Sequence, residues 1–167
     1  MRRGLIIIAA ALLFPMTAHA EEIPAEVRAV AEELCSDRCV CPELVEAIAC
    51  SESHFTVDII SSDGGFYGLC QVSPWWNRYR MAELGVTKSD LLTIRGNLMV
   101  AVDLLADLFE EYEDPVEVLL QYGGFSEAKK WKYRNEGVIP AYIQGVLERS
   151  ARYEEEHRKE RENDANR

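Results

Sequence analysis

The feature that most constrains the fold of this chain is an amphipathic segment at residues 97–112. Its apolar side chains return every three or four positions: they are Leu98, Ala101, Leu105, Leu108 and Tyr112, with Leu104 alongside. This spacing matches the turn of an α-helix and places the apolar side chains on one face. The segment is therefore predicted to be a helix that forms the hydrophobic spine of the domain.

Shorter helical patterns lie on both sides of this spine. They cover residues 23–34, 42–53, 115–122, 128–133 and 139–153. Proline stands in the first turn of two of them, at Pro42 and Pro115, where its missing N–H removes no helical hydrogen bond. A chain of 167 residues with 48% hydrophobic content can bury one core, but not two comfortable ones. The predicted fold class is therefore all-α, in one compact domain.

One stretch, residues 56–74, departs from the helical pattern. Val57, Ile59 and Ile60 favour extended backbone, and Asp63 is followed by two glycines, which is a turn signal. A small hairpin or an irregular loop is predicted here, directly after the second helix.

Both ends of the chain are expected to lie outside the domain, which is predicted over residues 21–153. Residues 1–20 begin with two arginines, continue through an apolar run and end in Ala-His-Ala, the pattern of a cleaved signal peptide. A membrane anchor is the weaker alternative, because the apolar run is short for a span. The protein is thus expected to be exported, to the periplasm, the cell envelope or the medium. The highly charged residues 154–167 are expected to form a frayed helix or a disordered tail.

The chain is acidic, with a formal net charge of −11 at pH 7. Cleavage after residue 20 removes two arginines and no acidic residue, so the exported chain would carry −13. A mean field of this sign repels nucleic acids and anionic lipid surfaces. Neither nucleic-acid binding nor stable membrane insertion is expected, and polysaccharides, which are held by shape and hydrogen bonds, fit better.

Five cysteines follow the predicted cleavage site: Cys35, Cys39, Cys41, Cys50 and Cys70. Export favours disulfide bonds, but an odd number leaves at least one cysteine without a partner in its own chain. Their pairing stays open, with Cys50 and Cys70 as one possibility. A zinc site is the weaker alternative, because the C-x-x-C spacing of structural zinc sites is absent and His54 is only a loosely placed fourth ligand.

A single acid, Glu52, stands at the predicted end of the second helix. Carbonyl dipoles at a helix C-terminus disfavour an anion, and the apolar neighbours Ile48 and Phe55 favour partial burial, which also disfavours the charged form. Both effects raise the pKa of Glu52 and suit it to general acid catalysis. From its position alone, the alternative is a solvated glutamate without a chemical role.

The residues from Glu52 onward form a series of motifs. They are E-S-x-F at residues 52–55, G-L-x-Q-x-x-P at 68–74, N-L at 97–98, Y-G-G at 122–124 and Y-I at 142–143, with serine and glycine in the first loop. In this order and at these spacings, they resemble the signature of the soluble lytic transglycosylases, the lysozyme-like enzymes that cut peptidoglycan. The resemblance covers about residues 42–146 and implies a lysozyme-like domain, all-α with a small α+β element.

Several positions depart from the family's usual pattern. Phe66 stands where alanine is common, Cys70 replaces a methionine, and Trp76 replaces a threonine. The first loop is one residue longer than usual, and the Y-G-G segment lacks the usual asparagine. The catalytic acid is retained, whereas the substrate contacts and the subfamily are less defined.

The resemblance implies a mechanism with one carboxylate. Glu52 would protonate the glycosidic oxygen between N-acetylmuramic acid and N-acetylglucosamine, and the substrate's acetamido group would stabilise the cationic centre. Glu52 would then act as the base toward the muramoyl 6-hydroxyl, which closes onto C1 to give a 1,6-anhydro end. No metal or other cofactor is expected. The expected partner is the glycan strand of peptidoglycan, and a secretion or conjugation apparatus is a candidate further partner.

The resemblance also implies substrate-binding residues: Ser53, Tyr67, Gln71, Trp76 and Tyr122. Tyr122 would stand near Glu52 and orient it or contact the saccharide, and Gln71 would bond sugar or stabilise its loop. Ser53 is expected to bond local backbone rather than substrate. Of the Trp75–Trp76 pair, one side chain is expected in the core and one at the cleft. Asn97 is expected to cap the spine helix.

Two other functions stay open from the sequence. A goose-type lysozyme relative would hydrolyse the same bond with a water held by an aspartate, and Asp58 and Asp63 lie in the appropriate loop. A non-catalytic protein that binds or assembles at the cell wall, in a secretion, conjugation or phage system, would keep the fold without needing Glu52.

Overall fold

The computed structural model describes residues 22–167, so the predicted signal peptide lies outside the described part. The helices are α1 (Ala25–Cys35), α2 (Pro42–Ser53), α3 (Arg78–Leu84), the 3₁₀ helix η1 (Asp90–Leu92), α4 (Ile94–Glu111), α5 (Pro115–Tyr122), α6 (Glu127–Glu136) and α7 (Ala141–Ala165). The all-α fold class is confirmed, with each predicted helix present.

Helix α4 is the predicted spine. Leu98, Ala101 and Leu105 are fully buried on it, and α1, α3 and α5 pack against it. It begins three residues earlier than the apolar pattern indicated, because Thr93 caps it by accepting a hydrogen bond from the Gly96 N–H at 3.1 Å. Asn97 is therefore not the cap, and its side chain has another task, described below.

The loop between α2 and α3 is irregular, as predicted. It contains two isolated antiparallel bridges, Ile60 with Tyr67 and Tyr67 with Val72. In the second bridge, the Tyr67 and Val72 N–H groups each donate to the other residue's carbonyl at 3.0 Å. The loop is thus folded back on itself and placed beside the end of α2.

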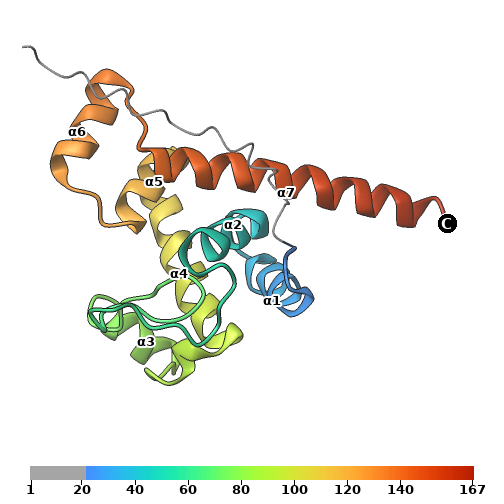
Figure 1. Cartoon of the computed structure of the whole chain (residues 1–167), viewed down its shortest axis with the longest axis horizontal. Helices are drawn as coiled ribbons and strands as arrows, with labels where there is room; N and C mark the ends of the chain where they lie inside the picture. Colours follow the sequence, from blue (N-terminus) through green and yellow to red (C-terminus); the bar gives the residue numbers. More distant parts are fainter. Residues whose placement is uncertain (1–21) are drawn as a thin grey trace, which may run out of the picture.

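Helix α7 crosses the molecule next to α2, and its C-terminal end projects beyond the other helices (Figure 1). It continues to Ala165, so residues 154–165 are helical rather than a disordered tail. Apolar periodicity missed this extension because His157, not an apolar side chain, is buried on it, at 2% exposure. The proposed domain end at residue 153 coincides with no break in the helix.

Two further expectations concern the export and redox state of the chain. In the part of the chain that the structure describes, which holds all five cysteines, no disulfide bond is formed, so the expected disulfide is not observed. Cys35, Cys50 and Cys70 are instead buried among core side chains. No helix within residues 22–167 is long and apolar enough to span a membrane.

Candidate active site

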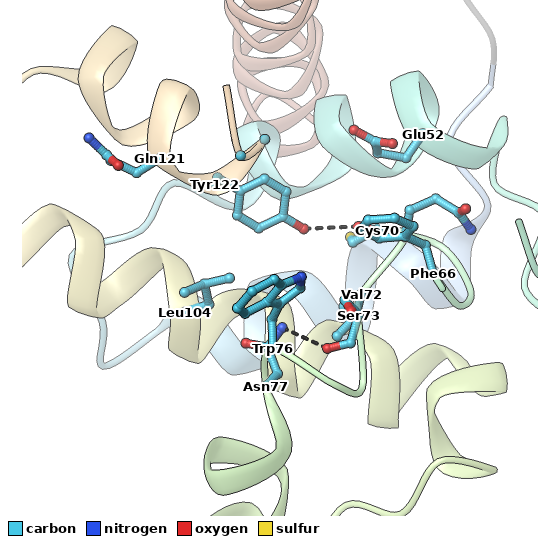
Figure 2. Close-up of a pocket in the computed structure, with 13 residues that line it drawn as sticks. Glu52, Phe66, Cys70, Val72, Ser73, Trp76, Asn77, Leu104, Gln121 and Tyr122 are labelled. Carbon is cyan, nitrogen blue, oxygen red and sulfur yellow. Dashed lines mark hydrogen bonds between the residues drawn. The ribbon is translucent and has the colours of Figure 1, made fainter. Parts of the chain in front are cut away.

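A cavity of about 670 Å³ lies between the end of α2, the irregular loop and the end of α5. Glu52 contributes its carboxylate from α2, Gln71 and Trp76 come from the loop segment, and Tyr122 comes from α5. Figure 2 shows Glu52 on one side of the cavity and Trp76 on the other, with Tyr122 between them in this view. This volume is in the range of small-ligand sites.

Glu52 is half-buried at the last turn of α2, and burial raises its pKa above the ordinary value of a glutamate. The hydroxyl of Tyr142, in the first turn of α7, donates a hydrogen bond to Glu52 Oε1 and lowers the pKa in part. The net shift is upward, which confirms the predicted direction. A glutamate that holds its proton longer and has one oxygen fixed is suited to donate that proton from the other oxygen.

Helix α7 fixes α2 at a second point near this acid. The Arg149 guanidinium donates to the Ser51 hydroxyl at 2.6 Å, and that hydroxyl donates to the Ala47 carbonyl at 2.7 Å. Tyr142 and Arg149 thus hold neighbouring residues at the end of α2. The position of the Glu52 carboxylate therefore depends on the packing of the C-terminal helix.

The opposite wall of the cavity depends on Asn97. This side chain is fully buried and donates to the carbonyls of Tyr67 at 2.7 Å and Leu91 at 2.8 Å, while its oxygen accepts from the Cys70 N–H at 2.8 Å. Three buried hydrogen bonds hold the loop onto the start of α4. Cys70 and Gln71 are thereby presented to the cavity.

The turn beside the Asn97 side chain requires glycine. Gly68 has φ +69°, and a Cβ there would lie 2.1 Å from the Leu91 carbonyl oxygen and 2.3 Å from Asn97 Nδ2. Within residues 22–167, positive φ outside glycine occurs at Gln71, which lines the cavity, and at His54 and Phe55, which follow Glu52 closely in sequence. Strained backbone of this kind clusters at functional sites and persists only where the surroundings enforce it.

A comparison with protein families identifies the family of this domain. The profile of the transglycosylase SLT domain matches residues 30–160. The chain belongs to this family. A comparison with curated proteins finds no match. The family assignment supports a transglycosylase-type enzyme that acts on peptidoglycan, and the matched region includes residues 154–160 of α7, which the sequence had assigned to a tail.

The SLT domain brings four of the six expected site residues to one cavity: Glu52, Gln71, Trp76 and Tyr122. Ser53 is not among them, because its hydroxyl is buried and donates to the Ala49 carbonyl at 3.0 Å, the backbone bond expected of it. Tyr67 is also buried, in the two bridges of the loop, and does not line the cavity.

Three details of the SLT domain differ from the sequence-based expectations. Trp75 and Trp76 are both exposed, at 69% and 77%, so neither lies in the core; the short turn before α3 keeps both outside. Tyr122 donates its hydroxyl to the Cys70 carbonyl at 3.0 Å, whereas the tyrosine bonded to Glu52 is Tyr142. The Y-I motif at residues 142–143 was the available signal for this contact.

Other groups that could take part in chemistry lie elsewhere in the described part of the SLT domain. Asp58 and Asp63 do not line the cavity, and the Asp63 carboxylate accepts from the Ser61 hydroxyl at 2.5 Å and the Gly65 N–H at 3.0 Å. No group of three or more potential metal ligands is found among residues 22–167.

Proposed function

We propose that the protein is a lytic transglycosylase that cleaves the β-1,4 bond between N-acetylmuramic acid and N-acetylglucosamine and leaves 1,6-anhydro ends. One observation carries this proposal: among the described residues that line the cavity, Glu52 is the only carboxylate. A standard glycosidase needs two carboxylates across the scissile bond. A single acid fits a reaction in which the substrate supplies the second group.

In the proposed reaction, Glu52 acts first as acid and then as base. Its raised pKa supports protonation of the glycosidic oxygen, and bond cleavage leaves a positive centre at C1 of the muramoyl sugar. The neighbouring acetamido oxygen stabilises this centre. The Glu52 carboxylate then accepts the proton of the 6-hydroxyl as that oxygen bonds to C1, so protons balance and no water is consumed.

Two features of the cavity support a sugar substrate. Trp76 and Phe66 offer exposed aromatic surface, and the amides of Gln71 and Asn77 offer hydrogen-bonding groups. The predicted signal peptide supports a site of action in the periplasm or cell envelope. Local opening of the wall for a secretion or conjugation apparatus is a biological role consistent with such an activity.

The test is a digest of purified peptidoglycan by the exported chain, residues 21–167, with released fragments read by mass spectrometry. We expect ends lighter by one water, absent with Glu52→Gln and retained with Glu110→Gln, which removes an exposed glutamate of α4. Reducing ends would replace this proposal with hydrolysis. If both the parent and the Glu52→Gln variant bind peptidoglycan but release no fragments, the protein has a non-catalytic role.

A further inference from the structure

A second cavity, of about 560 Å³, adjoins the one that contains Glu52. Phe66, Ser73 and Trp76 line both cavities, so the two share a wall. Trp75 and Lys88 line the second cavity only. A ligand that extends past Trp76 from the first cavity would therefore enter the second.

Three exposed aromatic side chains line this second cavity. Trp75 is 69% exposed, Trp76 77% and Phe66 41%. Single exposed aromatic residues are common on soluble proteins, but three around one hollow form an apolar patch of the kind that marks a binding site.

The backbone that carries Phe66 and Trp75 is held by hydrogen bonds, and the Trp75 ring has a cation–π contact. The Phe66 N–H donates to the Ser61 hydroxyl and the Ser61 N–H donates to the Phe66 carbonyl, both at 3.0 Å. On the other side, Arg78 donates to the Trp75 carbonyl at 2.9 Å, and its guanidinium lies 5.3 Å from the centre of the Trp75 ring. A fixed backbone and a positioned Trp75 ring reduce the conformational entropy that binding would cost.

The charged groups of the second cavity are already engaged. The Lys88 ammonium lies 4.7 Å from the centre of the Tyr67 ring. The Asp63 carboxylate accepts hydrogen bonds from Ser61 and Gly65. The other lining residues are three aromatic side chains, two glycines, a serine and a proline, a neutral surface that suits the C–H faces of uncharged sugar rings better than the free carboxylates of a peptide stem.

We propose that the second cavity continues the glycan site, and that Trp75, with Phe66 and Trp76, stacks sugar rings that lie beyond those around Glu52. The protein then selects long glycan strands over short ones. This inference rests on the proposed substrate, but not on the proposed chemistry, because it concerns binding.

The test measures dissociation constants by calorimetry in a Glu52→Gln background, which removes turnover. The probes are peptide-free glycan strands of alternating N-acetylglucosamine and N-acetylmuramic acid, graded by length. Trp75→Ala should weaken binding of the longest strands roughly tenfold, as expected when one stacked ring is lost, and leave the shortest strand that binds unchanged. The affinity of the Trp75→Ala variant should therefore stop rising at a shorter strand length than that of the Glu52→Gln chain, which is the parent in this test.

Trp131→Ala is the matched control, because Trp131 is 56% exposed on α6 and lines neither cavity. Its length dependence should equal the parent's. Equal affinity of the Trp75→Ala variant and the parent for every strand would overturn the inference, as would an equal loss of affinity for strands of every length.

The two proposals fail separately. If the parent chain forms no anhydro ends but Trp75 still controls the binding of long strands, the second cavity stands as a glycan site and the proposed chemistry is wrong. If anhydro ends form and Trp75→Ala changes no dissociation constant, the chemistry stands and this inference is wrong.

Discussion

Glu46 is an acid buried in α2 without a hydrogen-bond partner for either carboxyl oxygen. It is 0% exposed, and the Nε2 atom of His157 lies 3.7 Å from its Oε2. Burial raises the pKa of Glu46 to about 8, with the charge of Arg28 opposing the shift. We predict that Glu46→Gln stabilises the protein, and that the gain grows with pH.

The magnitude follows from the two pKa values of Glu46, about 8 when folded and 4.5 as the ordinary reference for the unfolded chain. Below pH 4.5 both states hold the proton, so parent and variant should be equally stable. Between pH 4.5 and 8 only the unfolded state releases it, so the parent loses stability as pH rises. The variant should therefore exceed the parent in free energy of unfolding by about 3 kcal/mol at pH 7 and about 5 kcal/mol above pH 8.5.

Urea denaturation of both chains from pH 4 to 9 measures this difference directly. At pH 7 the gain corresponds to a rise in Tm of roughly 6–12 °C. Glu110→Gln removes the same charge from an exposed position on α4 and should give a difference near zero at every pH. A Glu46→Gln gain that does not vary with pH, or a loss at pH 8, would refute the reasoning, since either result means that the carboxylate has a partner that stabilises it.

Three further predictions concern the site and α7. Tyr142→Phe removes the hydrogen bond that lowers the pKa of Glu52, so the pKa should rise and the basic limb of the kcat/KM profile should move to higher pH. The loss of this contact should also lower kcat roughly 10- to 100-fold. A shift of the basic limb to lower pH would contradict this prediction. Gly68→Ala should lower the free energy of unfolding by about 3 kcal/mol or more in urea, because its Cβ meets backbone, whereas Gly64→Ala, with φ +71° and open space around it, should lower it by only about 1 kcal/mol; equal losses would contradict this. Truncation after residue 160 should leave Tm within about 2 °C of that of the full chain. Truncation after residue 153 should lower Tm by more than about 6 °C, because it also removes the buried imidazole of His157. Equal Tm values for the two truncated chains would contradict this prediction.

Local patterns in the sequence predicted the elements of the fold well. Asp114 and Pro115 begin α5 as expected, with the Asp114 carboxylate accepting from the Val116 N–H at 3.0 Å, because a cap and a first-turn proline act within a few residues. The position of Glu52 at the last turn of α2, and hence the upward direction of its pKa, follows from the same kind of local signal. The place of Glu52 and the direction of its pKa could thus be predicted locally, whereas its proposed role came from the family resemblance.

Contacts between distant segments were the part that the sequence could not supply. Asparagine is a residue type that often caps helices, but Asn97 instead bonds carbonyl and N–H groups of a loop about 30 residues earlier in the chain. The local spacing of residues carries no signal of these bonds. One of Trp75 and Trp76 was expected in the core, but both lie in the turn before α3 and are exposed. Such outcomes depend on which backbone groups are left to be satisfied once the helices have packed.

The pairing of α2 with α7 shows why this limit matters for function. Glu52 and Tyr142 lie 90 residues apart in sequence and are joined by a hydrogen bond, and farther along the same two helices Glu43 meets His157 at 3.0 Å. Residues 154–160 look like a solvated tail because their contribution is one buried imidazole rather than an apolar stripe. Because the His157 imidazole helps to fix α7 along α2, and Tyr142 of α7 bonds Glu52, a segment that resembles a disordered end is tied by packing to the position of the Glu52 carboxylate.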